Sequence, residues 1–431
     1  MNATAPAAEL QAVLARQRAR VVAHLARSLG LSHLALAEDA VQAASLRALQ
    51  AWPAQGVPAN PAGWLYRVAR HAAIDALRVS GRHEAWPDED EAAASGLPLS
   101  PPPAGRFAGE LDDEELALLF CACHPALPPA SQLAVALRAL AGLDLATIAA
   151  GLLCSEAALA QRLARAREQI APEQLRLPAG HELAPRRDAV LTALSLAFHA
   201  GARARTRRGD ADGRDDATAL CWEAIRLARA LAAHPAAAHA DADALAAMLL
   251  LHGARLSGQL DEAGDIVLLP GQPRDRWDAG MVRMGLAHLQ AAQRAERLSR
   301  WHLLAGIAAE HATAPDHAGT DLRTIAAYYE LLLKMDPSAA PRLAHAIALA
   351  EAGEPQAALD RLQALQGNVP APLRPHVLAA MARSHERLGA LTQALQLLRQ
   401  AADAAPHDAD ARALRRRADA LLSCARGGPG R

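Results

Sequence analysis

The feature that most constrains this chain is the dominance of alanine and leucine among its apolar residues. Both residues are strong helix formers, whereas the β-branched and aromatic residues that favour strands are scarce, with aromatic residues at only 3%. At 431 residues the chain has the length of two or three domains. We therefore expect an all-α protein with more than one domain.

Two interruptions in the helical pattern predict how the chain is divided. Residues 81–110 contain an acidic run at 88–91 and a proline-rich stretch at 97–103, a composition that cannot bury a core. Pro172 and Gly180 mark the second interruption. The sequence therefore predicts a helical module over residues 6–80, a flexible linker over 81–110, a second helical module over 111–172 and a long helical domain over 182–424.

A weak internal repeat lies in the last of these parts. Gly353 is followed by Ala357-Ala358-Leu359, and Gly389 is followed by Gln393-Ala394-Leu395, at an offset of 36 residues. This offset is close to the roughly 34 residues of a tetratricopeptide helix pair. A solenoid-like stack of helix pairs is one interpretation, and an irregular helical domain with chance similarity is the other.

The helix expected to start near Asn60 carries a basic stripe. Its predicted buried side holds Leu65, Val68, Ala69, Ala72 and Ala76. Its opposite side holds Arg67, Arg70, His71, Asp75 and Arg78, with Trp64 at the edge. Arginine neutralises phosphate and aromatic rings stack on unpaired bases, so this surface suits a strand of DNA. The alternative is a solvated arginine face with Trp64 turned into the core.

The preceding helix, expected over about residues 33–51, presents a different surface. Leu34, Ala37, Val41 and Leu49 are its expected buried residues. Glu38, Asp39 and Gln42 form an acidic and amide patch near its start. Acidic residues at that end complement the helix dipole, which is one explanation. The other is that the patch binds a basic partner.

Residues 143–156 have the spacing of a helix-turn-helix. We expect a short helix capped by Asp144, a turn near Gly151 and a second helix capped by Ser155. Leu159, Leu163, Ala166 and Ile170 form the apolar face of the second helix, opposite Ala157, Gln161 and Arg165, with Arg162 at the flank. Arginine and glutamine read guanine and adenine edges in the major groove, although any antiparallel helix pair could imitate this pattern.

Other features limit the classes of function. The net charge is −1, so DNA contacts must come from local patches. Five scattered cysteines argue against a disulfide framework and for a cytoplasmic protein, and without an apolar run of 18 residues we expect no membrane span. Cys121-Ala122-Cys123-His124 reads as a buried helix end, and Asp210, Asp212, Asp215 and Asp216 read as a polar loop, rather than as metal sites. We expect no cofactor and, without a catalytic motif, no enzymatic activity.

In combination and order, these motifs resemble the extracytoplasmic-function group of sigma-70-class RNA polymerase sigma factors, in the subgroup with a C-terminal tetratricopeptide-like extension. Residues 37–42 are similar to the polymerase-binding helix of region two, residues 60–78 to the promoter-melting segment, and residues 112–127 to the start of region four. Further similar segments are 161–167, 275–278, 320–321 and 325–329. The resemblance therefore covers nearly the whole chain.

The resemblance implies roles for the candidate residues. Glu38, Asp39 and Gln42 would contact the β′ clamp helices of core RNA polymerase, and region four would contact its β flap. Asn60, Trp64, Arg67, Arg70, His71 and Arg78 would bind the minus-ten element of promoter DNA. Ser155, Ala157, Gln161, Arg162 and Arg165 would bind the minus-thirty-five element. The C-terminal domain would regulate this activity, under the control of a small molecule or a protein.

Two residues of the sigma-like part depart from the pattern of that group, as do residues 198–202 and 343–345 of the C-terminal part. Ala43 stands where an acidic residue is usual, and Thr147 stands where glutamate is usual. These changes would weaken polymerase or phosphate contacts. The alternative function is therefore a helical-repeat scaffold with a degenerate sigma-like N-terminus.

Overall fold

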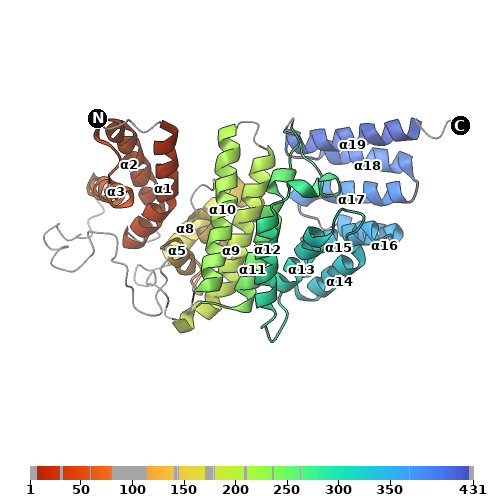
Figure 1. The fold of residues 1–431 in the computed structure, drawn as a ribbon, viewed down its shortest axis with the longest axis horizontal. Helices are drawn as coiled ribbons and strands as arrows, with labels where there is room; N and C mark the ends of the chain where they lie inside the picture. The colour runs from red at the N-terminus through yellow and green to blue at the C-terminus, as the bar shows by residue number, and fades with distance from the viewer. Residues whose placement is uncertain are drawn as a thin grey trace. The chain divides into compact units, whose positions relative to one another are not determined.

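The computed structural model describes residues 7–29, 33–58, 60–79, 114–139, 143, 145–169, 178, 180–207, 211–234, 237–262, 264–367 and 369–426. The predicted linker at 81–110 and the predicted cap Asp144 lie outside these residues. Within them, every regular element is a helix, and the only β pairing is an isolated bridge between Leu260 and Ile266. The prediction of an all-α fold is confirmed (Figure 1).

The chain forms two compact units. The first comprises residues 1–194 with 233–237, and the second comprises residues 195–232 with 238–431. The division falls inside one long helix, α9 (Gly180–Arg207). Arg186 in the first half of α9 is only 3% exposed and donates a 3.0 Å hydrogen bond from Nη1 to the carbonyl oxygen of Phe120. This bond ties the start of α9 to the first unit.

The first unit begins with three mutually packed helices, α1 (Ala7–Leu29), α2 (Leu34–Gln55) and α3 (Pro61–Val79). The buried residues of α2 are Leu34, Ala37, Ala40, Val41, Ala44, Ala48 and Trp52. Leu49, expected to be buried, is exposed, because the interior stripe runs through Ala48 and Trp52 instead. The helix also continues to Gln55, past the end expected at about residue 51.

Helix α3 also presents a different face to the core from the expected one. Leu65, Ala69 and Ala73 are fully buried, at intervals of one turn, whereas Ala76 is exposed and Ala72 is half-buried. The helix is therefore rotated relative to the predicted face, because its sides contact both α1 and α2. This rotation decides which basic residues reach the surface.

The rest of the first unit contains α5 (Glu114–Ala122), α6 (Pro129–Ala139), α7 (Leu145–Gly151) and α8 (Glu156–Gln169). Cys121 in the last turn of α5 and Cys123 directly after its end are both buried, as predicted. Burial raises the pKa of the Cys123 thiol to about 12, so this thiol stays protonated near neutral pH. Among the described residues, no group of three or more metal-binding side chains is present.

The second unit is a series of helices interrupted by one irregular segment. After the end of α9 come α10 (Ala211–Ala233), α11 (Ala240–Ala254), α12 (Ala279–Ala292), α13 (Arg300–Thr313) and α14 (Leu322–Met335). Residues 211–216, expected in a loop, form the start of α10. The described residues of 255–278, between α11 and α12, form short 3₁₀ turns and the isolated bridge as their only regular structure.

The last five helices are α15 (Ala339–Glu351), α16 (Pro355–Gln366), α17 (Arg374–Arg387), α18 (Leu391–Asp403) and α19 (Asp408–Arg426). Figure 1 shows α17, α18 and α19 side by side. Gly353 has φ 98° between α15 and α16, and Gly389 has φ 77° between α17 and α18. The two glycines thus form equivalent left-handed helix ends, 36 residues apart. That this part of the chain is a tetratricopeptide-like repeat domain stays a prediction.

Candidate nucleic-acid interface

The start of α3 is set by Asn60. Its Oδ1 accepts a 2.9 Å hydrogen bond from the amide of Gly63, which is the geometry of a helix N-cap. A Cβ at Gly63 would lie 2.8 Å from Asn60 Nδ2, so glycine leaves the room that the cap needs. Asn60 therefore has a structural role as the cap of α3, in addition to its predicted contact with DNA.

The basic stripe on α3 is smaller than predicted. Arg67 and His71 are exposed and lie one turn apart on the same face. Arg70, expected beside them, is only 9% exposed, because the rotation of α3 turns it toward the rest of the bundle. The Arg78 side chain lies outside the described residues.

Trp64 sits at the inner edge of this surface. Its ring packs edge to face on the buried Trp52 of α2, with 5.4 Å between the ring centroids. Tyr66, on another side of α3, packs edge to face on His24 of α1 at 4.6 Å. Trp64 is half-buried, so part of its ring surface stays accessible beside Arg67.

The patch on α2 is divided between free and paired residues. Asp39 and Gln42 are exposed. Glu38 forms a bidentate ion pair with Arg138 of α6, in which Arg138 Nη1 donates a 2.7 Å hydrogen bond to Glu38 Oε1. Burial raises the pKa of Glu38, and the charge of Arg138 partly offsets this effect. Arg138 lies 100 residues away in sequence, and no pattern around it signals the pairing.

The turn between α7 and α8 has a well-defined geometry. The amide of Cys154 donates a 3.0 Å hydrogen bond to the carbonyl of Ala149, and the amide of Leu153 donates a 3.3 Å hydrogen bond to the carbonyl of Ala150. This pattern is a Schellman motif. Leu153 takes the left-handed conformation, with φ 53°, and is the only non-glycine described residue with positive φ. The turn was expected near Gly151, which is the last residue of α7, and the turn follows directly after it.

Helix α8 matches its predicted faces. Ser155 accepts a 3.2 Å hydrogen bond from the amide of Ala158, so it caps the helix as expected. Leu159, Leu163 and Ala166 are buried, while Ile170 lies outside the described residues. The candidate DNA-binding residues Ser155, Ala157, Gln161 and Arg165 are all exposed, with Arg162 half-buried at the flank. A polar face with small residues at the helix start is free for a groove-binding role.

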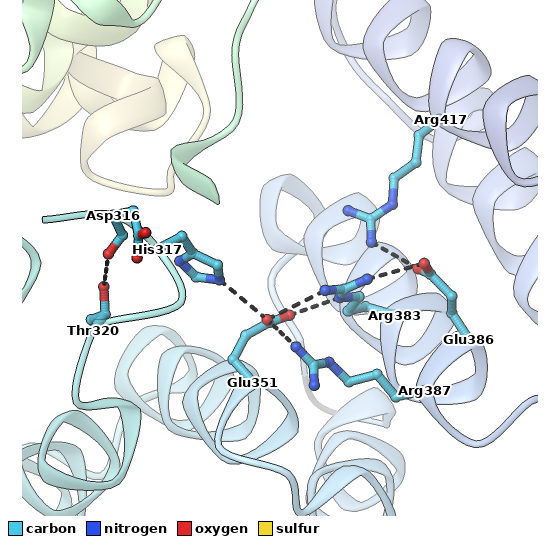
Figure 2. Close-up of polar contacts among 8 residues, drawn as sticks. All are labelled: Asp316, His317, Thr320, Glu351, Arg383, Glu386, Arg387 and Arg417. Atoms are coloured by element: carbon cyan, nitrogen blue, oxygen red, sulfur yellow. Dashed lines mark hydrogen bonds and ion pairs between the residues drawn. The ribbon is translucent and has the colours of Figure 1, made fainter. Parts of the chain in front are cut away.

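The second unit contains a charged network of a different kind (Figure 2). Glu351 at the end of α15 binds Arg383 Nε of α17 at 2.7 Å and also pairs with Arg387 and His317. Glu386 pairs with Arg383 and with Arg417 of α19, each at 3.0 Å. Burial acts to raise the pKa of Glu351, but the hydrogen bonds and charges of the two arginines outweigh it and hold this pKa at about 2. The network joins three helices and pairs two carboxylates with three arginines.

Comparison with known proteins identifies two parts of the chain. Residues 14–83 match sigma-70 region 2, and residues 186–293 match a family of unknown function, DUF6596. An uncharacterized protein of Rhizobium meliloti (strain 1021) is 35% identical over 386 residues, which cover 86% of this chain and 88% of that protein. The chain belongs to the same family as that protein. No solved structure matches the chain.

These matches give the surfaces of the first unit a context. The sigma-70 region 2 at residues 14–83 contains α2 and α3 and supports a sigma-70-class factor with a role in transcription initiation. Proteins with this region in general bind core RNA polymerase and promoter DNA. The DUF6596 match covers α10, α11 and α12 and the irregular segment 255–278. Among the described residues, no helix has the length and hydrophobicity of a membrane span.

Proposed function

We propose that this protein is an RNA polymerase sigma factor of the extracytoplasmic-function group, which binds core polymerase and directs it to promoters with two separate DNA elements. One observation carries the proposal. A helix with a free polar face, α8, follows a tight turn in the same unit as a match to sigma-70 region 2. A protein with both features can hold two sites along a promoter.

In this proposal the exposed residues of α8 read the minus-thirty-five element. Gln161 and Arg165 have the side chains that pair with adenine and guanine edges, and both are exposed on one face. Ser155 and Ala157 lie at the helix N-terminus, where small residues and free amides favour close approach to phosphate. Arg162, whose Nη1 lies 4.0 Å from the sulfur of Cys154, flanks this face.

The surface of α3 would bind the minus-ten element. Arg67 and His71 supply the exposed polar groups, and the half-buried Trp64 offers a ring beside them for an unpaired base. Asn60 and Arg78 would also bind this element. Arg70 would act from inside the module by raising the local positive potential, because it is buried in the free protein.

The patch on α2 would bind the β′ clamp helices, with a further contact from the second module to the β flap. Asp39 and Gln42 are free to do so, whereas Glu38 must first leave Arg138. The C-terminal unit would regulate this activity. No catalytic role is proposed for any residue.

Run-off transcription with core polymerase tests the proposal. We expect the full-length protein to start transcripts at a discrete promoter, and Arg67→Glu to reduce them about tenfold or more, since each lost phosphate contact weakens DNA binding. Arg283→Glu on α12 is the matched control, because Arg283 is exposed and lies in the other unit. A chain that starts no transcript at any promoter, or activity unchanged by Arg67→Glu, would favour the scaffold function instead.

A further inference from the structure

Two arginines of the DUF6596 part share one buried tryptophan. Trp277, at the end of the irregular segment, is 7% exposed. The guanidinium carbon of Arg274 lies 3.9 Å from the centroid of its ring, and that of Arg255 lies 5.8 Å from the same ring. Cation–π attraction accounts for the stacking of Arg274 on the ring face, but it leaves the donors at the edge of the guanidinium unused.

These donors have no partner among the described residues. The Nε, Nη1 and Nη2 atoms of Arg274 and the Nε of Arg255 are buried and form no hydrogen bond. In contrast, Arg383, Arg387 and Arg417 of the same unit all pair with carboxylates, as Figure 2 shows. A buried charged donor that lacks an acceptor keeps its full desolvation cost. Arg274 therefore differs from these three arginines, which each pair with a carboxylate.

The surroundings of Arg274 and Arg255 carry positive potential. Burial and the neighbouring charge of Arg274 lower the pKa of Arg255 to about 10. Burial and the charges of Arg255 and Arg274 lower the pKa of His311 on α13 to about 4. Asp316 is the carboxylate that acts on Arg274, yet its Oδ1 accepts a hydrogen bond from the amide of Gly319, and no ion pair joins the two described residues.

The backbone around this cluster is held in place. The amide of Asp278 bonds the carbonyl of Ala254 at 2.9 Å, and the carboxylate of Asp278 caps α12 through the amide of Met281. Gln272 donates a 2.9 Å hydrogen bond to the carbonyl of Val267. Because the ends of the segment are tied to α11 and α12, the two arginines are positioned before any ligand arrives.

We propose that Arg274 and Arg255, stacked on Trp277, bind the oxyanion group of a small ligand, either a carboxylate or a phosphate. A guanidinium offers two parallel donors that match either group, and a low-polarity surrounding strengthens such a bond. The ligand reaches the covered nitrogen atoms when the part of the segment between the two arginines, residues 259–272, opens locally. The described residues of this part are joined by short-range turn hydrogen bonds and one isolated bridge. The proposal does not depend on the function of the first unit.

Binding to the full-length protein tests this site. Inorganic phosphate and acetate are titrated separately at constant ionic strength against chloride, with the melting temperature and the heat of binding as readouts. We expect a saturable rise in melting temperature with at least one probe, and about tenfold weaker binding in Arg274→Met. The probe that binds tells whether the ligand carries a phosphate or a carboxylate. Arg283→Met, which removes an exposed arginine of α12, is expected to bind like the wild type.

The same variant has a second readout without any anion. In chloride buffer we expect Arg274→Met to melt at the same temperature as the wild type or above it, because it removes an unpaired buried charge. No saturable response to either probe in the wild type, or an equal response in Arg274→Met, would overturn the proposal. So would a clear loss of stability in Arg274→Met without anion, since Arg274 would then be structural.

Discussion

Leu153 shows how one residue can set the geometry of a functional element. Leu153 has a left-handed conformation, with φ 53°, at a position where glycine is usual. This conformation ends α7 and sets the direction in which α8 begins. A side chain with a Cβ pays roughly 1–2 kcal/mol for this conformation. Leu153 is 41% exposed, so little packing compensates for the strain.

We therefore expect Leu153→Gly to be more stable than Leu153→Ala by about 1 kcal/mol, because only glycine relieves the strained conformation. Both variants lose the same exposed side chain, which makes alanine the matched control. Urea unfolding followed by circular dichroism measures the difference. Equal stability of the two variants would show that the turn relaxes around any residue.

At the scale of elements, α15, α17 and α19 are joined by charge pairs as well as by apolar packing. Glu351 and Glu386 bind arginines from neighbouring helices, and their side chains are 12% and 27% exposed. A pKa of Glu351 near 2 means that the fold stabilises the ionised form of this side chain relative to its protonated form. The network thus links the stability of these helices to pH.

The sign of this linkage is determined by the lowered pKa. Glu351 stabilises the fold above its ordinary pKa of 4.5, and this contribution is lost as the pH falls toward 2. We expect Glu351→Gln to reduce the free energy of unfolding at about pH 6 by roughly 1–3 kcal/mol. The lower value applies if water screens the charges of the partly exposed arginines.

Thermal unfolding between about pH 6 and pH 3 measures this effect. The difference in melting temperature between the wild type and Glu351→Gln should become smaller as the pH falls. Glu296→Gln, at an exposed position of the same unit, should show no such gap. A gap that stays constant with pH would mean that the carboxylate charge of Glu351 is unimportant.

At the scale of the whole molecule, the chain combines a unit with a sigma-70 region 2 and a unit with a DUF6596 part. The first unit holds one of its proposed polymerase contacts in an internal ion pair, because Glu38 binds Arg138. Polymerase and Arg138 would therefore compete for Glu38. Partly exposed ion pairs contribute about 0.2–1 kcal/mol, so the competition is modest.

Removing Arg138 should release Glu38. We expect Arg138→Gln to bind core polymerase about two- to fivefold more tightly than the wild type, since no ion pair has to break. Arg138→Lys keeps the charge and should bind like the wild type, and Glu38→Gln should bind more weakly. Fluorescence anisotropy of the labelled protein with core enzyme measures these affinities. Unchanged binding of all three variants would remove Glu38 from the proposed interface.

The sequence by itself determined the helical class of the protein and the parts of the fold that depend on local periodicity. Leu159, Leu163 and Ala166 are buried on α8 as predicted, and Ser155 caps that helix. Cys121 and Cys123 are core residues as predicted. Such features follow from the helix repeat and from backbone groups a few residues away, so they are readable along the chain.

Only the tertiary structure decided which residues at the edge of an amphipathic helix face are buried. Ala48 is buried in place of Leu49, and Arg70 is turned inward, because each helix is contacted by two neighbours and not by one flat surface. Pairing between distant charges has the same origin. Glu38 meets Arg138 while Arg274 meets no carboxylate among the described residues, since partners far apart in sequence are brought together or kept apart only by packing.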